Sequence, residues 1–284
     1  MSGSKKKIAI VTDSISSLTQ AMGREHDVHV VPIHIFFGTD AYCDDIDLNA
    51  EAFYELLRES KQMPTTSQPT ALEFHQVYAQ VAREAEAIVS IHASKEVSAT
   101  VDCARAARNE LPDVPIHVID SRTLSMGQGL IVIAAARAAA AGKSAGEIVQ
   151  LVEELVPKTK VLFTVETLEY LRRGGRIGGA TALLGSALKI KPVLHIEHGR
   201  VEPLEKPRTR KRAIERLLDL MAEQVGTADN VHAAVLHCDA EDEAQRLAER
   251  VAARFQCVEL FAAEAGPTIG AHGGPGTVGL TFYS

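Results

Sequence analysis

The chain has 284 residues, of which 46% are hydrophobic and 24% charged, which is typical of a globular protein and excludes a mainly disordered one. The formal net charge of -7 argues against a broad nucleic-acid-binding surface. The most apolar stretch, residues 130–136, ends at Arg137, well short of the roughly 20 residues that span a bilayer. We therefore expect a cytoplasmic protein without a secretory leader, which binds no nucleic acid and contacts membranes only transiently.

The first half of the chain alternates apolar runs with helical patterns. Residues 8–13, 87–92 and 116–120 resemble strands buried on both faces, and residues 28–37 form a further strand region. Helical spacing or capping boxes predict helices at 49–60, after Thr70, at 127–141 and from Ser144 to about 157. This order predicts an α/β domain over residues 1–158, with a doubly wound, mostly parallel sheet.

The second half has a different pattern. Residues 191–204 predict a hairpin that turns at His198-Gly199, and residues 209–224 and 241–255 have amphipathic helical spacing. Further strands are expected at 161–165, 232–238, 258–262 and 277–283. We predict an α+β domain over residues 159–284 with a mixed, mostly antiparallel sheet, and a ligand between the two domains.

Metal and disulfide chemistry have little support in the sequence. The four cysteines form no C-x-x-C pair, none has a histidine at zinc-finger spacing, and no H-E-x-x-H motif occurs. We interpret Cys43, Cys103, Cys238 and Cys257 as reduced thiols, and expect neither a metal nor a cofactor.

Polar segments follow several of the predicted strands. Ligands of doubly wound sheets bind beyond the carboxyl ends of the strands, where Asp13, Ser94, Ser98 and Ser121 would gather. The hydroxyls of Ser94 and Ser98, just before a helix, are suited to an anion, although simple helix capping explains them equally well.

Three further segments are candidates for binding an anion. Thr66 and Ser67 lie in a proline-framed loop, and Arg176 lies between two glycine pairs as a planar donor. His272 lies in a loop of glycines and prolines, residues 266–276, where a histidine has little packing role. A solvated loop or a surface arginine is the alternative in each case.

Taken in order, these segments resemble the DegV family over nearly the whole chain. The resemblance rests on Ile10-Val-Thr-Asp-Ser14, Thr66-Ser-Gln-Pro69, Val118-Ile-Asp-Ser121, Gly174-Gly-Arg-Ile177 and Gly270-Ala-His-Gly-Gly-Pro-Gly276. Three positions depart from the family pattern: Lys95 replaces a serine, Ala99 a glycine and Gly273 a threonine.

The resemblance implies a carrier that binds one long-chain fatty acid, for example a C16 or C18 chain. It also implies that, in a host with a fatty acid kinase, the carrier presents the acid for acyl-phosphate formation in phospholipid metabolism. By position, Thr66 and Ser94 would bind the carboxylate, with His272 and Arg176 completing the polar site. Secondary polar contacts would come from Ser67, Ser98, Asp13 and Ser121. Arg208 and Arg210 would face the kinase, and the apolar tunnel would include Leu183, Leu184, Leu188 and Ile269.

Two other functions stay open at this point. Ser94 with His272, and Asp13 or Asp120 behind them, could form a nucleophile and base for hydrolysis of a lipid ester or thioester. The sequence has no G-x-S-x-G motif to support that function. His272 could instead engage a small carbonyl compound in a ligand-binding subunit of a sugar-type kinase.

Overall fold

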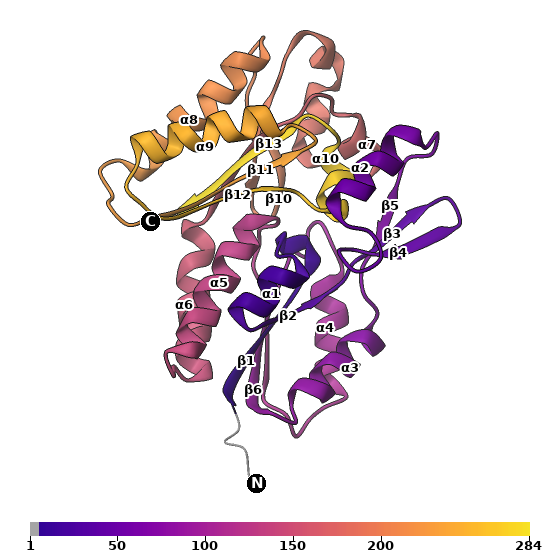
Figure 1. The fold of residues 1–284 in the computed structure, drawn as a ribbon, viewed down its shortest axis with the longest axis vertical. Helices are drawn as coiled ribbons and strands as arrows, with labels where there is room; N and C mark the ends of the chain where they lie inside the picture. The colour runs from indigo at the N-terminus through magenta and orange to yellow at the C-terminus, as the bar shows by residue number, and fades with distance from the viewer. Residues whose placement is uncertain (1–5) are drawn as a thin grey trace.

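The computed structural model describes residues 6–284 and contains three sheets (Figure 1). A parallel sheet has the strand order β2-β1-β6-β7. Its strands are β1 (Lys6–Asp13), β2 (Val28–Val31), β6 (Ala85–His92) and β7 (Ile116–Asp120). These pairings confirm the predicted parallel arrangement, and the central strands β1 and β6 are apolar runs covered on both faces.

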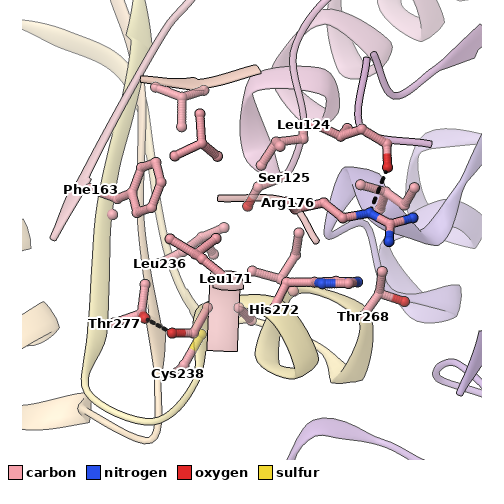
Figure 2. Close-up of a pocket in the computed structure, with 18 of the residues that line it drawn as sticks. Leu124, Ser125, Phe163, Leu171, Arg176, Leu236, Cys238, Thr268, His272 and Thr277 are labelled. Carbon is pink, nitrogen blue, oxygen red and sulfur yellow. Dashed lines mark hydrogen bonds between the residues drawn. The ribbon is translucent and has the colours of Figure 1, made fainter. Parts of the chain in front are cut away.

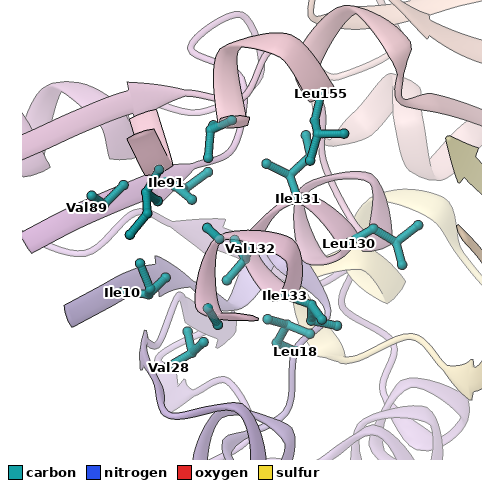
Figure 3. Close-up of a cluster of buried hydrophobic side chains, with 14 of the residues drawn as sticks. Ile10, Leu18, Val28, Val89, Ile91, Leu130, Ile131, Val132, Ile133 and Leu155 are labelled. Atoms are coloured by element: carbon teal, nitrogen blue, oxygen red, sulfur yellow. The ribbon is translucent and has the colours of Figure 1, made fainter. Parts of the chain in front are cut away.

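Helices cover both faces of the parallel sheet. Alternate residues of β1 separate the two faces: Ile8 and Ile10 pack toward α5 and α6, whereas Ala9 and Val11 pack toward α3 and α4. Figure 3 shows the first of these clusters, in which the apolar residues 130–133 of α5 meet Ile10 and Ile91. The helices are α1 (Gln20–His26), α3 (Ala71–Val81), α4 (Thr100–Asn109), α5 (Met126–Ala140) and α6 (Ala145–Lys158). Both predicted capping boxes are present, at Thr70 and Ser144.

A small sheet of order β4-β3-β5 corrects two predictions. The strand region predicted at 28–37 is two strands in different sheets, because Pro32 lacks the N–H that would continue the ladder. The loop predicted around Thr66 instead contains a short strand that pairs with β3. The elements are β3 (His34–Phe37), β4 (Asp40–Cys43), β5 (Thr65–Ser67) and the predicted helix α2 (Ala50–Glu59).

The third sheet has the order β10-β9-β8-β13-β11-β12 and is antiparallel except for the β11–β12 pair. This confirms the predicted mixed sheet and the hairpin at His198-Gly199. The strands are β8 (Lys160–Thr164), β9 (Val193–Glu197), β10 (Arg200–Glu205), β11 (Val231–Cys238), β12 (Cys257–Glu264) and β13 (Thr277–Tyr283). Helices α8 (Arg210–Val225) and α9 (Glu241–Arg254) cover one face of it, above the sheet in Figure 1.

The connections between these strands carry three short helical segments. They are α7 (Glu169–Arg173), the 3-10 segment η2 (Gly178–Lys189) and α10 (Pro267–Gly273). The loop predicted around His272 is therefore wrong in part, because Pro267 occupies the first turn of α10, where its missing N–H costs nothing. No helix within residues 6–284 is long and apolar enough to cross a membrane.

The predicted domain boundary at residues 158 and 159 falls between α6 and β8, which belong to different sheet systems. Two apolar clusters nevertheless combine side chains from both sides of that boundary, including Leu236 with Ile10 and Cys238 with Phe53. The division into two domains stays a prediction.

A buried polar network fixes the carboxyl ends of β1 and β6. The Asp13 carboxylate accepts from His92 Nδ1 at 2.8 Å and from Gln128 Nε2 at 3.2 Å. His92 Nε2 then meets Ser90 Oγ at 2.7 Å, and Ser90 Oγ meets the Tyr78 hydroxyl at 2.7 Å. All five side chains are fully buried, so their hydrogen bonds stabilise the fold only while every partner is present.

We expect Ser90→Ala to lower the free energy of unfolding by about 1–3 kcal/mol, because it leaves His92 Nε2 and the Tyr78 hydroxyl buried without partners. Urea unfolding followed by circular dichroism measures the loss. Adding Tyr78→Phe to Ser90→Ala removes one orphaned group and should cost less than the sum of the two single changes. A loss below about 0.5 kcal/mol in Ser90→Ala would show that the network contributes little.

Candidate functional site

A cavity lies between the small sheet, the edge of the parallel sheet and the inner face of the third sheet (Figure 2). Its apolar wall comes from widely separated segments, which contribute Ile15, Ile33, Val97, Leu124, Val161, Phe163, Leu171, Val201, Leu236, Ala265 and Ile269. Figure 2 places Arg176, His272 and Thr268 across the cavity from Phe163, while the hydroxyl residues Thr277 and Thr281 line it from β13. Within residues 6–284, no Asp or Glu lines this cavity. The arrangement suits a ligand with a long apolar part and an anionic end.

Thr66 and His272 meet at the polar end of the cavity. The Thr66 hydroxyl on β5 lies 2.8 Å from His272 Nε2 on α10, across 206 residues of sequence. Strand pairing with β3 fixes Thr66, since Ile35 is its cross-strand neighbour. The structure thus brings together two of the residues that we predicted for the carboxylate site.

The His272 ring is largely buried, and its Nδ1 has no hydrogen-bond partner within residues 6–284. Burial, aided by the Arg176 charge, lowers the pKa of His272 from 6.5 to about 4. A Cβ added to Gly174 would lie 2.2 Å from His272 Nδ1, so only glycine lets the backbone approach the ring this closely. At neutral pH the polar end therefore presents a neutral imidazole, whose Nε2 contacts the Thr66 hydroxyl and whose Nδ1 lies buried against Gly174.

Arg176 is held at the same end by two backbone carbonyls. Its Nε donates to Val97 O at 2.9 Å and one terminal nitrogen donates to Gly174 O at 2.7 Å. These bonds fix the guanidinium plane, while no carboxylate within residues 6–284 pairs with it. A half-buried arginine without an ion pair beside an apolar cavity is suited to bind an anion.

Ser94 lies outside the cavity wall, which differs from its predicted position. It is fully buried, and a Cβ on Gly199 would lie 2.2 Å from its hydroxyl, so the β9–β10 turn covers it. Its hydroxyl accepts from Glu96 N at 3.2 Å, and its carbonyl accepts from the amides of Val97 and Ser98. Ser94 thus forms the turn that carries Val97 and Ser98 to the wall.

Of the four residues predicted as secondary polar contacts, two lie at or beside the cavity and two lie away from it. Ser98 lines the cavity, and its hydroxyl lies 2.7 Å from that of Thr100. Ser67 is beside the wall and donates to Gln68 O at 3.4 Å. Asp13 belongs to the buried network, and Ser121 donates to Thr123 O at 3.3 Å, so neither reaches the cavity.

Of the three described residues predicted for the tunnel, Leu183, Leu184 and Ile269, only Ile269 lines the cavity. Leu183 is buried in a cluster that also contains the wall residues Leu171, Val201 and Phe163, and Leu184 is 38% exposed. The Leu188 side chain lies outside the described part of the structure. Leu183 therefore packs in a cluster that borders the cavity without lining the cavity itself, and the sequence does not show which members of such a cluster reach the wall.

The two arginines predicted to face a kinase differ in their surroundings. Arg208 is exposed. Arg210 donates to Glu243 Oε2 at 2.7 Å and to Gly276 O at 2.5 Å, and only 18% of its side chain is exposed. Arg210 therefore holds α8, α9 and the turn after α10 together, and Arg208 alone has the exposure that a partner contact needs.

The arrangement does not supply the predicted serine and histidine pair for hydrolysis. His272 contacts Thr66, and Ser94 is covered by the β9–β10 turn. Ser90, His92 and Asp13 have the distances of a catalytic triad, but all three are fully buried and none lines the cavity. The described residues 6–284 contain no cluster of three metal-ligating side chains, and the four cysteines are free.

Six polar residues of the wall were not predicted from the sequence, namely Gln68, Ser125, His237, Thr268, Thr277 and Thr281. The Thr268 hydroxyl donates to the buried Asp44 carboxylate, which also accepts from Ser14 at 2.9 Å. Burial raises the pKa of Asp44 to about 6. Asp44 follows Cys43 in a segment without strong periodicity, so only the fold reveals that it joins α10 to the start of the chain.

The three positions at which the chain departs from the family pattern differ in their relation to the cavity wall. Lys95 and Ala99 are exposed and lie outside it. Gly273 lines the cavity, where a Cβ would lie 3.2 Å from Thr277 Oγ1. A side chain at position 273 would therefore press against Thr277, in the part of the wall next to His272.

Comparison with known proteins gives one consistent result. The family model described as an uncharacterised protein of the DegV family matches residues 7–284. Three similar solved structures are a fatty-acid-binding DegV family protein from Thermus thermophilus, the fatty acid binding protein DegV from Bacillus subtilis, and a stearic-acid-binding protein from Eubacterium ventriosum.

The first of these structures has 35% identity and a TM-score of 0.93, with 98% of this chain and 99% of that chain covered. The second has 33% identity and a TM-score of 0.91, with the same coverage. The third has 26% identity and a TM-score of 0.88, with 97% of this chain and 98% of that chain covered. Since the family match spans nearly the whole chain, the chain belongs to the DegV family.

Proposed function

We propose that this protein binds a single long-chain fatty acid, with the carboxylate at the Thr66–His272–Arg176 end and the acyl chain in the apolar part of the cavity. The observation that carries the proposal is the combination of an apolar wall with a neutral imidazole and an unpaired guanidinium at one end. The fatty acids bound by similar DegV family structures support the same ligand class.

The physical chemistry of the cavity agrees with this ligand. A carboxylate taken out of water needs several donors, which the Thr66 hydroxyl, the His272 ring and the Arg176 guanidinium can supply. Each methylene transferred to the apolar wall contributes about 0.8 kcal/mol. The chain therefore supplies most of the affinity, and the polar end fixes which way the acid enters. A C16 or C18 chain is the proposed length.

Ser98 is the further hydroxyl that can approach the carboxylate, since it lines the cavity beside Val97. Ser94 supports this position through the turn that it caps. In this role a Ser94→Ala change would weaken binding indirectly, by loosening Ser98 and the carbonyl that holds Arg176.

We further propose that the protein acts as a carrier that presents the acid to a fatty acid kinase in hosts that have one. The exposed Arg208 is suited to meet such a partner, whereas Arg210 is engaged with Glu243. Pull-down of the kinase by the wild-type protein but not by Arg208→Glu would support this role, and equal recovery with both would contradict the assignment of Arg208.

Thr66→Val should reduce the amount of fatty acid that copurifies with the protein, because valine keeps the shape but removes the hydroxyl that faces His272. The measurement is mass spectrometry of the organic extract from denatured protein, quantified per chain. We expect about one equivalent from wild-type protein and less from the variant, whose affinity for the acid should fall about tenfold, a loss of about 1.4 kcal/mol.

Thr65→Val is the matched control, because Thr65 neighbours Thr66 on β5 and is exposed. It should retain the wild-type amount of lipid. Equal amounts of lipid in all three proteins would show that Thr66 does not bind the carboxylate. Absence of lipid from wild-type protein, even after incubation with excess palmitic acid, would refute the proposed ligand.

His272 makes the stability of the ligand-free protein depend on pH. Its pKa is about 4 in the folded protein and 6.5 in its ordinary state, so the unfolded chain binds more protons between these values. The neutral His272 ring therefore leaves the free energy of unfolding at its full value above pH 6.5, and this free energy decreases as the pH falls toward 4. From pH 7.5 to 5.0 we expect wild-type protein to lose on the order of 2 kcal/mol more than His272→Gln in urea unfolding.

The comparison of the two proteins isolates His272 from other titrating groups. Asp44 has a raised pKa of about 6, so its protonation stabilises the folded state as the pH falls through the same range. Because Asp44 is present in both proteins, its effect cancels in the comparison. Equal losses in wild-type protein and His272→Gln would show that the ring is not held neutral by burial. With palmitic acid bound, the carboxylate should raise the pKa of His272 and diminish the difference between the proteins.

A further inference from the structure

Val161 separates the cavity from a second hollow. This second hollow, the rear cleft, lies among the β7–α5 loop, the α6–β8 junction and the β9–β10 hairpin, and its lining includes Arg122, Thr123, Lys160, His195 and His198. Among residues 6–284, Val161 is the one side chain that lines both hollows. The partition between them is therefore a single valine thick at this point.

The partition lies at the end of the cavity that is remote from His272. Strand β13 begins at Thr277, just after α10, and Thr281 is the cross-strand neighbour of Val161. Four residues of strand separate Thr277 from Thr281, a distance of roughly 13 Å. Strand β8 likewise begins near Val161 and ends toward α7 and Arg176, with Phe163 as its next inward residue.

Val161 is fixed by close packing against the first turn of α5. A Cβ added to Gly127 would lie 2.6 Å from Val161 Cγ2 and 2.5 Å from Thr123 Oγ1. The valine is only 6% exposed, although it lines two hollows. The neighbouring Thr123 hydroxyl is buried and has no hydrogen-bond partner within residues 6–284. The partition is thus a rigid contact between β8 and α5.

We propose that Val161 is the residue that limits acyl chain length, by stopping the methyl end of the bound acid. This inference rests on the proposed function, since it assumes that the carboxylate lies at the Thr66–His272 end. Beyond Val161 the rear cleft mixes charged side chains such as Arg122 and Lys160 with apolar ones such as Leu204. The side chain of Val161 itself, rather than the polarity of the cleft, would therefore stop the methyl end. The preferred ligand is therefore the longest unbranched acid whose chain ends at Val161.

The test is a chain-length series. Delipidated wild-type protein, Val161→Ala and Val161→Leu each receive lauric, myristic, palmitic, stearic, arachidic and behenic acid in competition with a fluorescent fatty acid. In wild-type protein we expect affinity to rise about fourfold per methylene and then stop rising at a limiting length. Val161→Ala should move that limit at least one step longer, and Val161→Leu at least one step shorter.

Val201→Ala is the matched control, because Val201 is also a valine of the cavity wall but does not border the rear cleft. It removes the same volume and should leave the limiting length unchanged. Thermal unfolding by circular dichroism verifies that each variant is folded. If Val161→Leu does not fold, Val161→Ala alone still tests the role of Val161.

The outcomes separate the two proposals. A limit that stays unchanged in folded Val161→Ala, or one that shifts equally in Val201→Ala, overturns the role of Val161 while fatty acid binding stands. If wild-type protein binds none of the acids, the proposed function itself is wrong and the inference falls with it.

Discussion

The hydrogen bond between Thr66 and His272 joins the small sheet to the segment before the last strand, and the candidate site depends on it. It requires a glycine at 174, since any Cβ there would meet the ring. It also requires α10 to be fixed, which Asp44 achieves through Thr268. A neutral imidazole and a backbone-held guanidinium are thus placed together, while the described wall offers them no acidic partner.

The rest of the cavity follows from how the sheets meet. The parallel sheet ends in loops that carry Val97, Ser98 and Leu124, and the third sheet turns its inner face toward these loops. Small residues of β13, such as Gly279, leave space between the layers that large side chains would fill. The apolar part of the site is therefore a space between the inner face of the third sheet and the loops of the parallel sheet, rather than a groove in one sheet.

Much of this architecture could be predicted from the sequence, because apolar runs such as residues 8–13 and capping boxes such as that at Thr70 are local signals. Thr66, Arg176 and His272 were predictable as a polar set from their unusual glycine and proline surroundings. The burial of Ser94 was not, since it depends on Gly199, more than a hundred residues away. Leu183 of η2 was misplaced for a similar reason: apolarity predicts burial but not whether the buried side chain reaches the cavity.

The central claim is that one end of the cavity holds a carboxylate and the other stops a methyl group. A crystal structure of the protein with palmitic acid tests it most directly. We predict a carboxylate within hydrogen-bond distance of Thr66 Oγ1 and His272, and an acyl chain that runs along Phe163 toward Val161. A chain in the opposite direction, or one outside the cavity, would contradict the account.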